Sequence, residues 1–186
     1  MKKLKNSKGL TLAEMLFCVF ILSLLAILTV TGAKFVKRTL TAMEERYGAG
    51  ILAEDLLTVI KEEFRFCTGL IIEDRKGAGT DITEVRVSYT SSVYGENTSL
   101  KIEPFEPGSP YGYLTIVYRD KVRKEYCPCK SLYKNLWLCP LDDETPVFRW
   151  DIDKEGVLVS FGICNEDGEI RWSVEDVPIR LLNISD

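Results

Sequence analysis

Histidine is absent from this chain of 186 residues, and its absence excludes a large group of reactions. Without an imidazole the protein cannot build a Ser/His/Asp or Cys/His catalytic pair, an HExxH zinc site or a histidine-containing zinc finger. An enzyme would need a carboxylate pair or an activated thiolate instead, and no spacing in the sequence singles one out. We therefore expect a protein that is not an enzyme and that carries no cofactor and no metal.

Positive charge is also scarce. The 24 lysine and arginine residues are outnumbered by 28 aspartate and glutamate residues, which gives a net charge of -4. Because binding to a polyanion requires a positive face, we expect no nucleic-acid partner. Four lysines precede Gly9, so a basic leader stands before a body that is more acidic than the whole. The composition, with 46% hydrophobic and 28% charged residues, fits one folded domain with an attachment segment.

Proline does not occur before Pro104, and within this proline-free stretch residues 10–66 have the pattern of a long helix. From Met15 to Ala33 there are 19 consecutive uncharged residues, enough at about 1.5 Å per residue to cross a hydrocarbon core of about 30 Å. Apolar residues then recur at helical spacings as far as Phe66. We predict one helix over residues 10–66, with a transmembrane part at 10–33 and an outer half whose apolar stripe a globular domain must cover.

The rest of the chain, residues 67–186, has the alternating pattern of strands. Apolar residues alternate at Val85 to Tyr89, at Leu114 to Tyr118 and at Val157 to Ile163. Asn165 to Gly168 has the composition of a hairpin turn, and segments 74–81, 90–98 and 104–112 are rich in loop-forming residues. We therefore predict an α+β fold in which the long amino-terminal helix packs on a carboxyl-terminal antiparallel sheet.

Glu14 is unusual because a carboxylate at the start of a membrane helix is costly. The residues around it, Lys-Gly-Leu-Thr-Leu-Ala-Glu from Lys8 to Glu14, run directly into the apolar segment. A short basic leader that ends in glycine, then a hydrophobic residue, then Thr and Leu, with Glu as the fifth residue after the glycine, resembles the processing site of type IV prepilins and pseudopilins.

The resemblance implies a set of roles for the amino-terminal residues. Residues 1–9 would be a leader that a prepilin peptidase removes between Gly9 and Leu10 on the cytoplasmic side, and the new amino group of Leu10 would be methylated. Thr11, Leu12 and Glu14 would act in filament assembly. There Glu14 would neutralise the amino terminus of a neighbouring subunit, since a buried charge persists only when it is paired.

The same resemblance implies a place in the cell and a set of partners. The chain would be a single-pass protein of the cytoplasmic membrane with an extracytoplasmic carboxyl-terminal domain, and later a subunit of a type IV pilus, a competence pseudopilus or a secretion filament. Its partners would be prepilin peptidase, other pilin or pseudopilin subunits and, before assembly, the lipid bilayer. Residues 51–57 and the β-rich tail look like the J-type minor pseudopilins. The alternative is a bitopic, membrane-anchored domain that binds a ligand outside the cytoplasm.

Cysteine supplies the remaining candidate site. Cys18 lies in the membrane run and is expected to pack there as an inert side chain. In an extracytoplasmic domain a disulfide is expected among the others, with Cys127, Cys129, Cys139 and Cys164 as its candidates and the connectivity open. A zinc site made of these four thiolates competes with it, although the single residue between Cys127 and Cys129 is fewer than the usual two to four. Reduced, packed thiols are the third alternative.

Overall fold

The computed structural model describes residues 12–73, 85–120, 122–128, 130, 133, 135–142, 145–151 and 155–183. Gly9, Leu10, Thr11 and Cys129, which carry predictions from the sequence, lie outside the described residues. The chain divides after Met43 into two compact units, and each is described by itself.

The first unit holds the amino-terminal stretch of helix α1, which as a whole spans Leu12–Arg65. Its apolar side chains are exposed, from Leu12 at 82% through Phe17 at 64% to Leu28 at 63%. This stretch is long and apolar enough to cross a membrane. Exposed apolar surface of this extent needs a lipid or protein environment to cover it.

The hydroxyl side chains of this stretch are satisfied within the helix. Ser23 donates a hydrogen bond to the Phe20 carbonyl at 2.7 Å, and Thr31 donates to the Ile27 carbonyl at 2.8 Å. Thr29 donates to a carbonyl of the preceding turn in the same way. Because a bilayer offers no water to an unpaired hydroxyl, these bonds reduce the cost of placing serine and threonine in an apolar medium.

The second unit begins at Glu44 and contains the carboxyl-terminal turns of α1. Here one face of the helix is buried at helical spacing, and its core residues are Ala49, Leu52, Ala53, Leu56, Ile60 and Phe64. The helix ends at Arg65, and the backbone N–H of Cys67 donates to the Phe64 carbonyl at 3.3 Å. The chain then enters the sheet at once.

Two glycines in α1 allow close packing rather than a break. The helix continues through Gly48 and Gly50. A Cβ built at either position would stand 3.4 Å from its nearest neighbour, which is Leu136 for Gly48 and Trp172 for Gly50. The missing side chains therefore let these two residues lie close to the helix backbone.

The sheet of the second unit has nine strands in the described part of the chain. They are β1 Thr68–Glu73, β2 Arg86–Ser91, β3 Gly95–Pro104, β4 Gly112–Asp120, β5 Val122–Tyr126, β6 Trp137–Cys139, β7 Phe148–Trp150, β8 Gly156–Cys164 and β9 Ile170–Arg180. Every pairing between them is antiparallel. The α+β class predicted from the sequence is confirmed.

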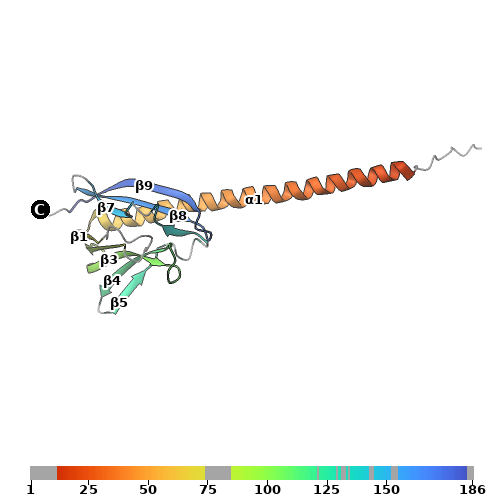
Figure 1. The fold of residues 1–186 in the computed structure, drawn as a ribbon. Helices are drawn as coiled ribbons and strands as arrows, with labels where there is room; N and C mark the ends of the chain where they lie inside the picture. The colour runs from red at the N-terminus through yellow and green to blue at the C-terminus, as the bar shows by residue number, and fades with distance from the viewer. Residues whose placement is uncertain are drawn as a thin grey trace, which may run out of the picture. The chain divides into compact units, whose positions relative to one another are not determined.

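The strands form one curled sheet beside the end of α1 (Figure 1). The main path runs β1-β2-β3-β4-β6-β8-β7, while β5 pairs with β4 and β9 pairs with β8. β1 also lies beside β7, so the two ends of the path approach each other. The buried face of the sheet and the buried face of the helix share one hydrophobic core.

The alternating patterns place the core side chains as predicted. Val87 and Tyr89 on β2, Leu114 and Ile116 on β4, and the odd-numbered residues 157–163 on β8 are all buried. The predicted hairpin joins β8 to β9, with Gly168 at a φ of 76°. Its turn is fixed by Asn165, whose side-chain oxygen accepts the backbone N–H of Asp167 at 3.2 Å and of Glu169 at 3.0 Å.

The prediction of a loop over residues 90–98 was wrong. β2 continues to Ser91 and β3 begins at Gly95, which leaves a turn of residues 92–94 between them. The Ser91 hydroxyl accepts the backbone N–H groups of Val93 at 3.1 Å and Tyr94 at 3.2 Å. Serine and threonine, which often mark loops, here close the turn or lie buried within the strand, as Thr98 does.

Candidate functional site

The first candidate site is the start of α1, where Glu14 lies in the first turn. A carboxylate in this position is favoured by the partial positive charge of the helix amino terminus. Leu12, the other predicted assembly residue in the described chain, is exposed. The helix therefore begins close to the predicted cut. Glu14, in its first turn, is the only acidic residue of the helix before Glu44.

Apolar side chains continue along α1 after the membrane segment, on both sides of the unit boundary at Met43. Phe35, Leu40, Met43 and Tyr47 are exposed at 71%, 54%, 62% and 74%. Burial begins only at Ala49, in the second unit. Within the first unit, Phe35, Leu40 and Met43 recur at roughly helical spacing and form an exposed apolar face of that unit.

The second candidate site comprises the cysteines, and the structure places them in three surroundings. Cys18 is exposed in the first unit, and Cys67 is buried after the end of α1. Burial, with a smaller contribution from the negative charge of Glu63, raises the pKa of the Cys67 thiol to about 11. A thiol in that state is a packing residue and a poor nucleophile at neutral pH.

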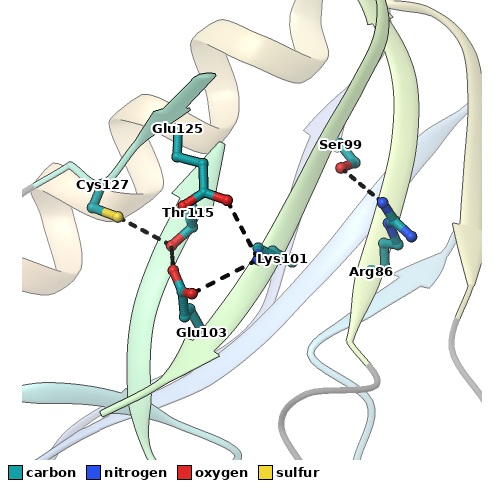
Figure 2. Close-up of polar contacts among 7 residues, drawn as sticks. All are labelled: Arg86, Ser99, Lys101, Glu103, Thr115, Glu125 and Cys127. Atoms are coloured by element: carbon teal, nitrogen blue, oxygen red, sulfur yellow. Dashed lines mark hydrogen bonds and ion pairs between the residues drawn. The ribbon is translucent and has the colours of Figure 1, made fainter. Parts of the chain in front are cut away.

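Cys127, after β5, makes a polar contact across to β4. Its Sγ lies 3.2 Å from the Thr115 hydroxyl, which also donates to the Glu103 carboxylate at 3.3 Å (Figure 2). Lys101 lies between two carboxylates, at 3.9 Å from Glu103 and 4.0 Å from Glu125. These groups satisfy one another across β3, β4 and β5, and half-exposed ion pairs of this kind add little stability. The arrangement joins the three strands through side-chain contacts.

Cys139 and Cys164 lie together in a small cluster of their own. Both are buried, Cys139 at 7% and Cys164 at 1% exposure, and Trp137 completes the buried set. Tyr111 and Tyr113 pack against it from the side. The four predicted disulfide candidates are therefore not equivalent: two share a cluster, Cys127 contacts Thr115, and Cys129 lies outside the described residues.

Aromatic rings cover this thiol pair. The Trp137 ring centroid lies 5.0 Å from that of Phe105 and 5.0 Å from that of Tyr111. The Trp137 indole N–H donates to the Tyr113 hydroxyl at 3.3 Å, and the Lys130 ammonium lies 4.8 Å from the centre of the Tyr113 ring. The thiols are thus packed among aromatic side chains. The polar groups of this cluster interact with one another, through the Trp137–Tyr113 hydrogen bond and the contact of Lys130 with the Tyr113 ring.

The two thiols of the cluster form a hydrogen bond to each other. That bond lowers the pKa of Cys164, although burial acts in the opposite direction. The same bond, together with burial, raises the pKa of Cys139. Cys164 is therefore the more acidic thiol of the pair and Cys139 the one that keeps its proton.

A buried carboxylate, Glu63, is a polar feature that sequence reasoning missed. It is 7% exposed and accepts hydrogen bonds from the Tyr89 hydroxyl at 3.0 Å and the Ser91 hydroxyl at 2.8 Å. Burial and the charge of Glu63 raise the pKa of Tyr89 above its ordinary value. The available signal was its place beside Ile60 and Phe64 on the apolar face of the helix.

No three metal-binding side chains come together among the described residues. Comparison with protein-family models, with curated proteins and with solved structures gives no match for this chain. The fold by itself defines the class: an α+β protein whose amino-terminal helix is long and apolar enough to cross a membrane.

Proposed function

We propose that this chain is a minor pilin or pseudopilin, a structural subunit of a filament of the type IV pilus, competence or type II secretion class. It is made as a membrane precursor, cut between Gly9 and Leu10 by prepilin peptidase, methylated on Leu10 and assembled through α1. The observation that carries the proposal is the string from Lys8 to Glu14, whose last three residues open the helix that begins at Leu12 and has Glu14 in its first turn.

The exposure of the first unit supports this proposal. Its apolar side chains need lipid before assembly and the helices of neighbouring subunits afterwards, and the serine and threonine hydroxyls there are already bonded to backbone carbonyls. The open apolar face at Phe35, Leu40 and Met43 lies beyond the membrane run. A filament provides neighbours for that face, while a single membrane anchor leaves it in water.

Glu14 has a specific role in this proposal. In a bundle of apolar helices the amino group of Leu10 from one subunit is a buried cation, and the Glu14 carboxylate of its neighbour is the counter-ion. Burying either charge alone is expensive, so the pair fixes the axial register between subunits. Thr11 and Leu12, which separate Leu10 from Glu14 in the sequence, would take part in the same assembly contacts.

The second unit faces outward in this proposal and makes contacts rather than performing turnover. Its antiparallel sheet presents mutually satisfied ion pairs, such as Lys101 with Glu103 and Glu125. These surfaces suit binding to other subunits or to exported cargo.

The test is the intact mass and amino-terminal sequence of the full chain extracted from cells that contain prepilin peptidase. A start at methylated Leu10 supports the proposal. A start at Met1 favours the alternative of a bitopic anchored binding domain, and a start after Ala33 makes the chain an ordinary secreted protein.

A matched pair of variants separates the two membrane-bound functions. Gly9→Val should abolish the cut if prepilin peptidase processes the chain, and a simple anchor should tolerate it without any change in mass beyond the substitution. Gly48→Ala serves as the control, because it changes a glycine of the same chain far from the cut. Processing of Gly9→Val at the wild-type level would overturn the proposal.

A further inference from the structure

Two buried cysteines on different strands, Cys139 of β6 and Cys164 of β8, lie in one cluster. We infer that these two residues are the pair that closes to a disulfide as the domain folds. The inference rests on the proposed function in one respect, since the domain must reach an oxidising space outside the cytoplasm.

The register of the strands brings the two sulfurs together. β6 pairs with β8 so that Trp137 is opposite Cys164 and Cys139 is opposite Gly162. Cys139 and Cys164 are thus diagonal neighbours on the same face of two adjacent strands. Gly162 provides the space between them: a Cβ built there would stand 2.9 Å from the Cys139 sulfur. The Cys139 side chain therefore lies over a glycine, on the side of the strand that Cys164 shares.

The other described cysteines have surroundings that keep them from this pair. Cys67 belongs to the main core between helix and sheet, and Cys18 lies in the first unit. Cys127 is engaged with Thr115 on β4. Among the described cysteines, Cys139 is the one that shares a buried cluster with Cys164.

The chemistry is a thiol–disulfide exchange with a disulfide oxidant, either a protein disulfide oxidoreductase or oxidised glutathione. The Cys164 thiolate attacks one sulfur of the oxidant, and the other sulfur leaves as a thiolate and takes up a proton. The Cys139 thiol then loses its proton and attacks the Cys164 sulfur of the mixed disulfide, which releases the second thiol of the oxidant. One S–S bond forms in the protein and one breaks in the oxidant, which gains two electrons and two protons.

The burial of the pair sets the order of events. Because both sulfurs are covered in the finished domain, the oxidant must act while β6 and β8 are pairing and before the aromatic cluster closes over them. β6 has only three residues, pairs with β8 through those three and meets β4 at one position. A covalent link would hold this short strand in the sheet and would be shielded from reductants afterwards.

The first test traps the thiols of the full chain in cells that make it with its leader. The cells are quenched in acid, the chain is unfolded and alkylated with N-ethylmaleimide, and its peptides are mapped by mass spectrometry. We expect one peptide pair linked through Cys139 and Cys164 that separates on reduction. Alkylated Cys139 and Cys164, or a link from either residue to Cys127 or Cys129, overturns the inference.

Variants provide the matched controls. Cys127→Ser should leave the link intact, and Cys139→Ser should abolish it and leave Cys164 alkylated. Retention of an intramolecular disulfide on Cys164 in the Cys139→Ser chain would contradict the pairing. Because these readouts come from peptides of the folded chain in cells, they do not depend on any activity.

A second test removes the dependence on cellular location. The purified full chain, unfolded and reduced in detergent, is refolded with oxidised and reduced glutathione. We expect a product about 2 Da lighter with the same link, and a midpoint of thermal unfolding several degrees above that of the reduced chain. Failure to form the link here overturns the pairing itself. If the link forms here but is absent in cells, the two cysteines can pair but do not form the disulfide in the cell. The proposed function is tested separately by the amino terminus: a start at methylated Leu10 in the same cells would still support it.

Discussion

The Tyr89 hydroxyl donates a hydrogen bond to the Glu63 carboxylate at 3.0 Å, and this contact joins the last turns of α1 to β2 inside the core. The Ser91 hydroxyl donates to the same carboxylate oxygen at 2.8 Å. Tyr89 also packs edge-on against Phe64, with ring centroids 5.6 Å apart. One carboxylate thus fixes both the helix end and the turn after β2.

Replacing this carboxylate should destabilise the second unit. Glu63→Ala leaves the hydroxyls of Tyr89 and Ser91 buried without their acceptor, and each such loss costs about 1–3 kcal/mol. Glu63→Gln keeps a carbonyl oxygen in place and should cost less than Glu63→Ala. The measurement is the midpoint of thermal unfolding of the full chain in detergent, followed by tryptophan fluorescence.

The control for this prediction is Glu62→Gln, because Glu62 is the exposed neighbour on the same turn. We expect its unfolding midpoint to match that of the wild-type chain, since surface substitutions are usually within about 0.5 kcal/mol. Equal midpoints for Glu63→Ala and Glu62→Gln would show that the buried carboxylate does not hold the helix end.

Glu63 also illustrates where prediction from the sequence ends. Periodicity found the buried face of the helix at Leu56, Ile60 and Phe64, and alternation found the strands, because both patterns follow directly from backbone geometry. The place of Glu63 on the apolar face indicates burial, but no local pattern identifies the groups that it binds. Its partners, Tyr89 and Ser91, lie 26 and 28 residues away, and their contact with it depends on how the sheet packs on the helix.

The cysteines make the same point for the candidate site. Spacing along the chain suggested that Cys127 and Cys129 act with Cys139 and Cys164, yet the strand pairing puts Cys139 beside Cys164 and turns Cys127 toward Thr115. Register between β6 and β8 decides this, and register is a long-range property that composition does not encode. The string from Lys8 to Glu14, by contrast, is a local pattern, so its resemblance to a prepilin processing site can be recognised from the sequence alone; the processing itself stays a prediction.

The raised pKa of Cys67 predicts low reactivity and a dependence of stability on pH. At pH 8 a thiol with a pKa of about 11 has a thiolate fraction about 100-fold below that of an ordinary thiol at 9.0, and burial slows access further. Alkylation of Cys67 by iodoacetamide should therefore be at least about 100-fold slower in the folded chain than in the same chain unfolded. Comparable rates in the two states would contradict the buried position.

The sign of the pH effect follows from the same raised pKa. Above pH 9.0 the unfolded chain loses the Cys67 proton while the folded chain keeps it, so the free energy of unfolding falls as the pH rises toward 11. Cys67→Ala should make this slope shallower between pH 9.0 and pH 10.0, while Cys139 and Tyr89, whose pKa values are also raised in the folded chain, account for the slope that remains. The measurement is urea unfolding across that range, and an unchanged slope in the variant would assign the effect elsewhere.

Gly162→Ala tests the space that Cys139 occupies. The added Cβ would stand 2.9 Å from the Cys139 sulfur and 3.4 Å from Ile170, and overpacking of this kind costs about 1–3 kcal/mol. The same Gly162→Ala change should cost much less stability in a Cys139→Ala chain, because the sulfur that the new Cβ meets has been removed. Thermal unfolding of the four chains measures the coupling, and strictly additive changes would show that the sulfur does not lie over the glycine.

Gly48→Ala should have the opposite effect. A Cβ there would meet Leu136 at 3.4 Å, which is ordinary van der Waals distance, and alanine is favoured over glycine inside a helix by about 1 kcal/mol. The unfolding midpoint should rise or stay level. A fall comparable to that of Gly162→Ala would mean that the helix and Leu136 approach more closely than this.

Glu14→Ala separates insertion from assembly. Removing a carboxylate from the start of an apolar helix makes membrane insertion easier, so under the proposed function the variant should reach the membrane and still be cut after Gly9. In the proposed filament it would leave the amino group of Leu10 without its counter-ion, and an unpaired buried charge costs about 3–5 kcal/mol. That corresponds to a loss of incorporation of at least about 100-fold, measured as the share of the chain that sediments with sheared filaments.

Glu44→Ala, which removes an exposed carboxylate further along the same helix, should assemble normally. Wild-type incorporation of Glu14→Ala would reduce Glu14 to a residue that only favours the start of α1.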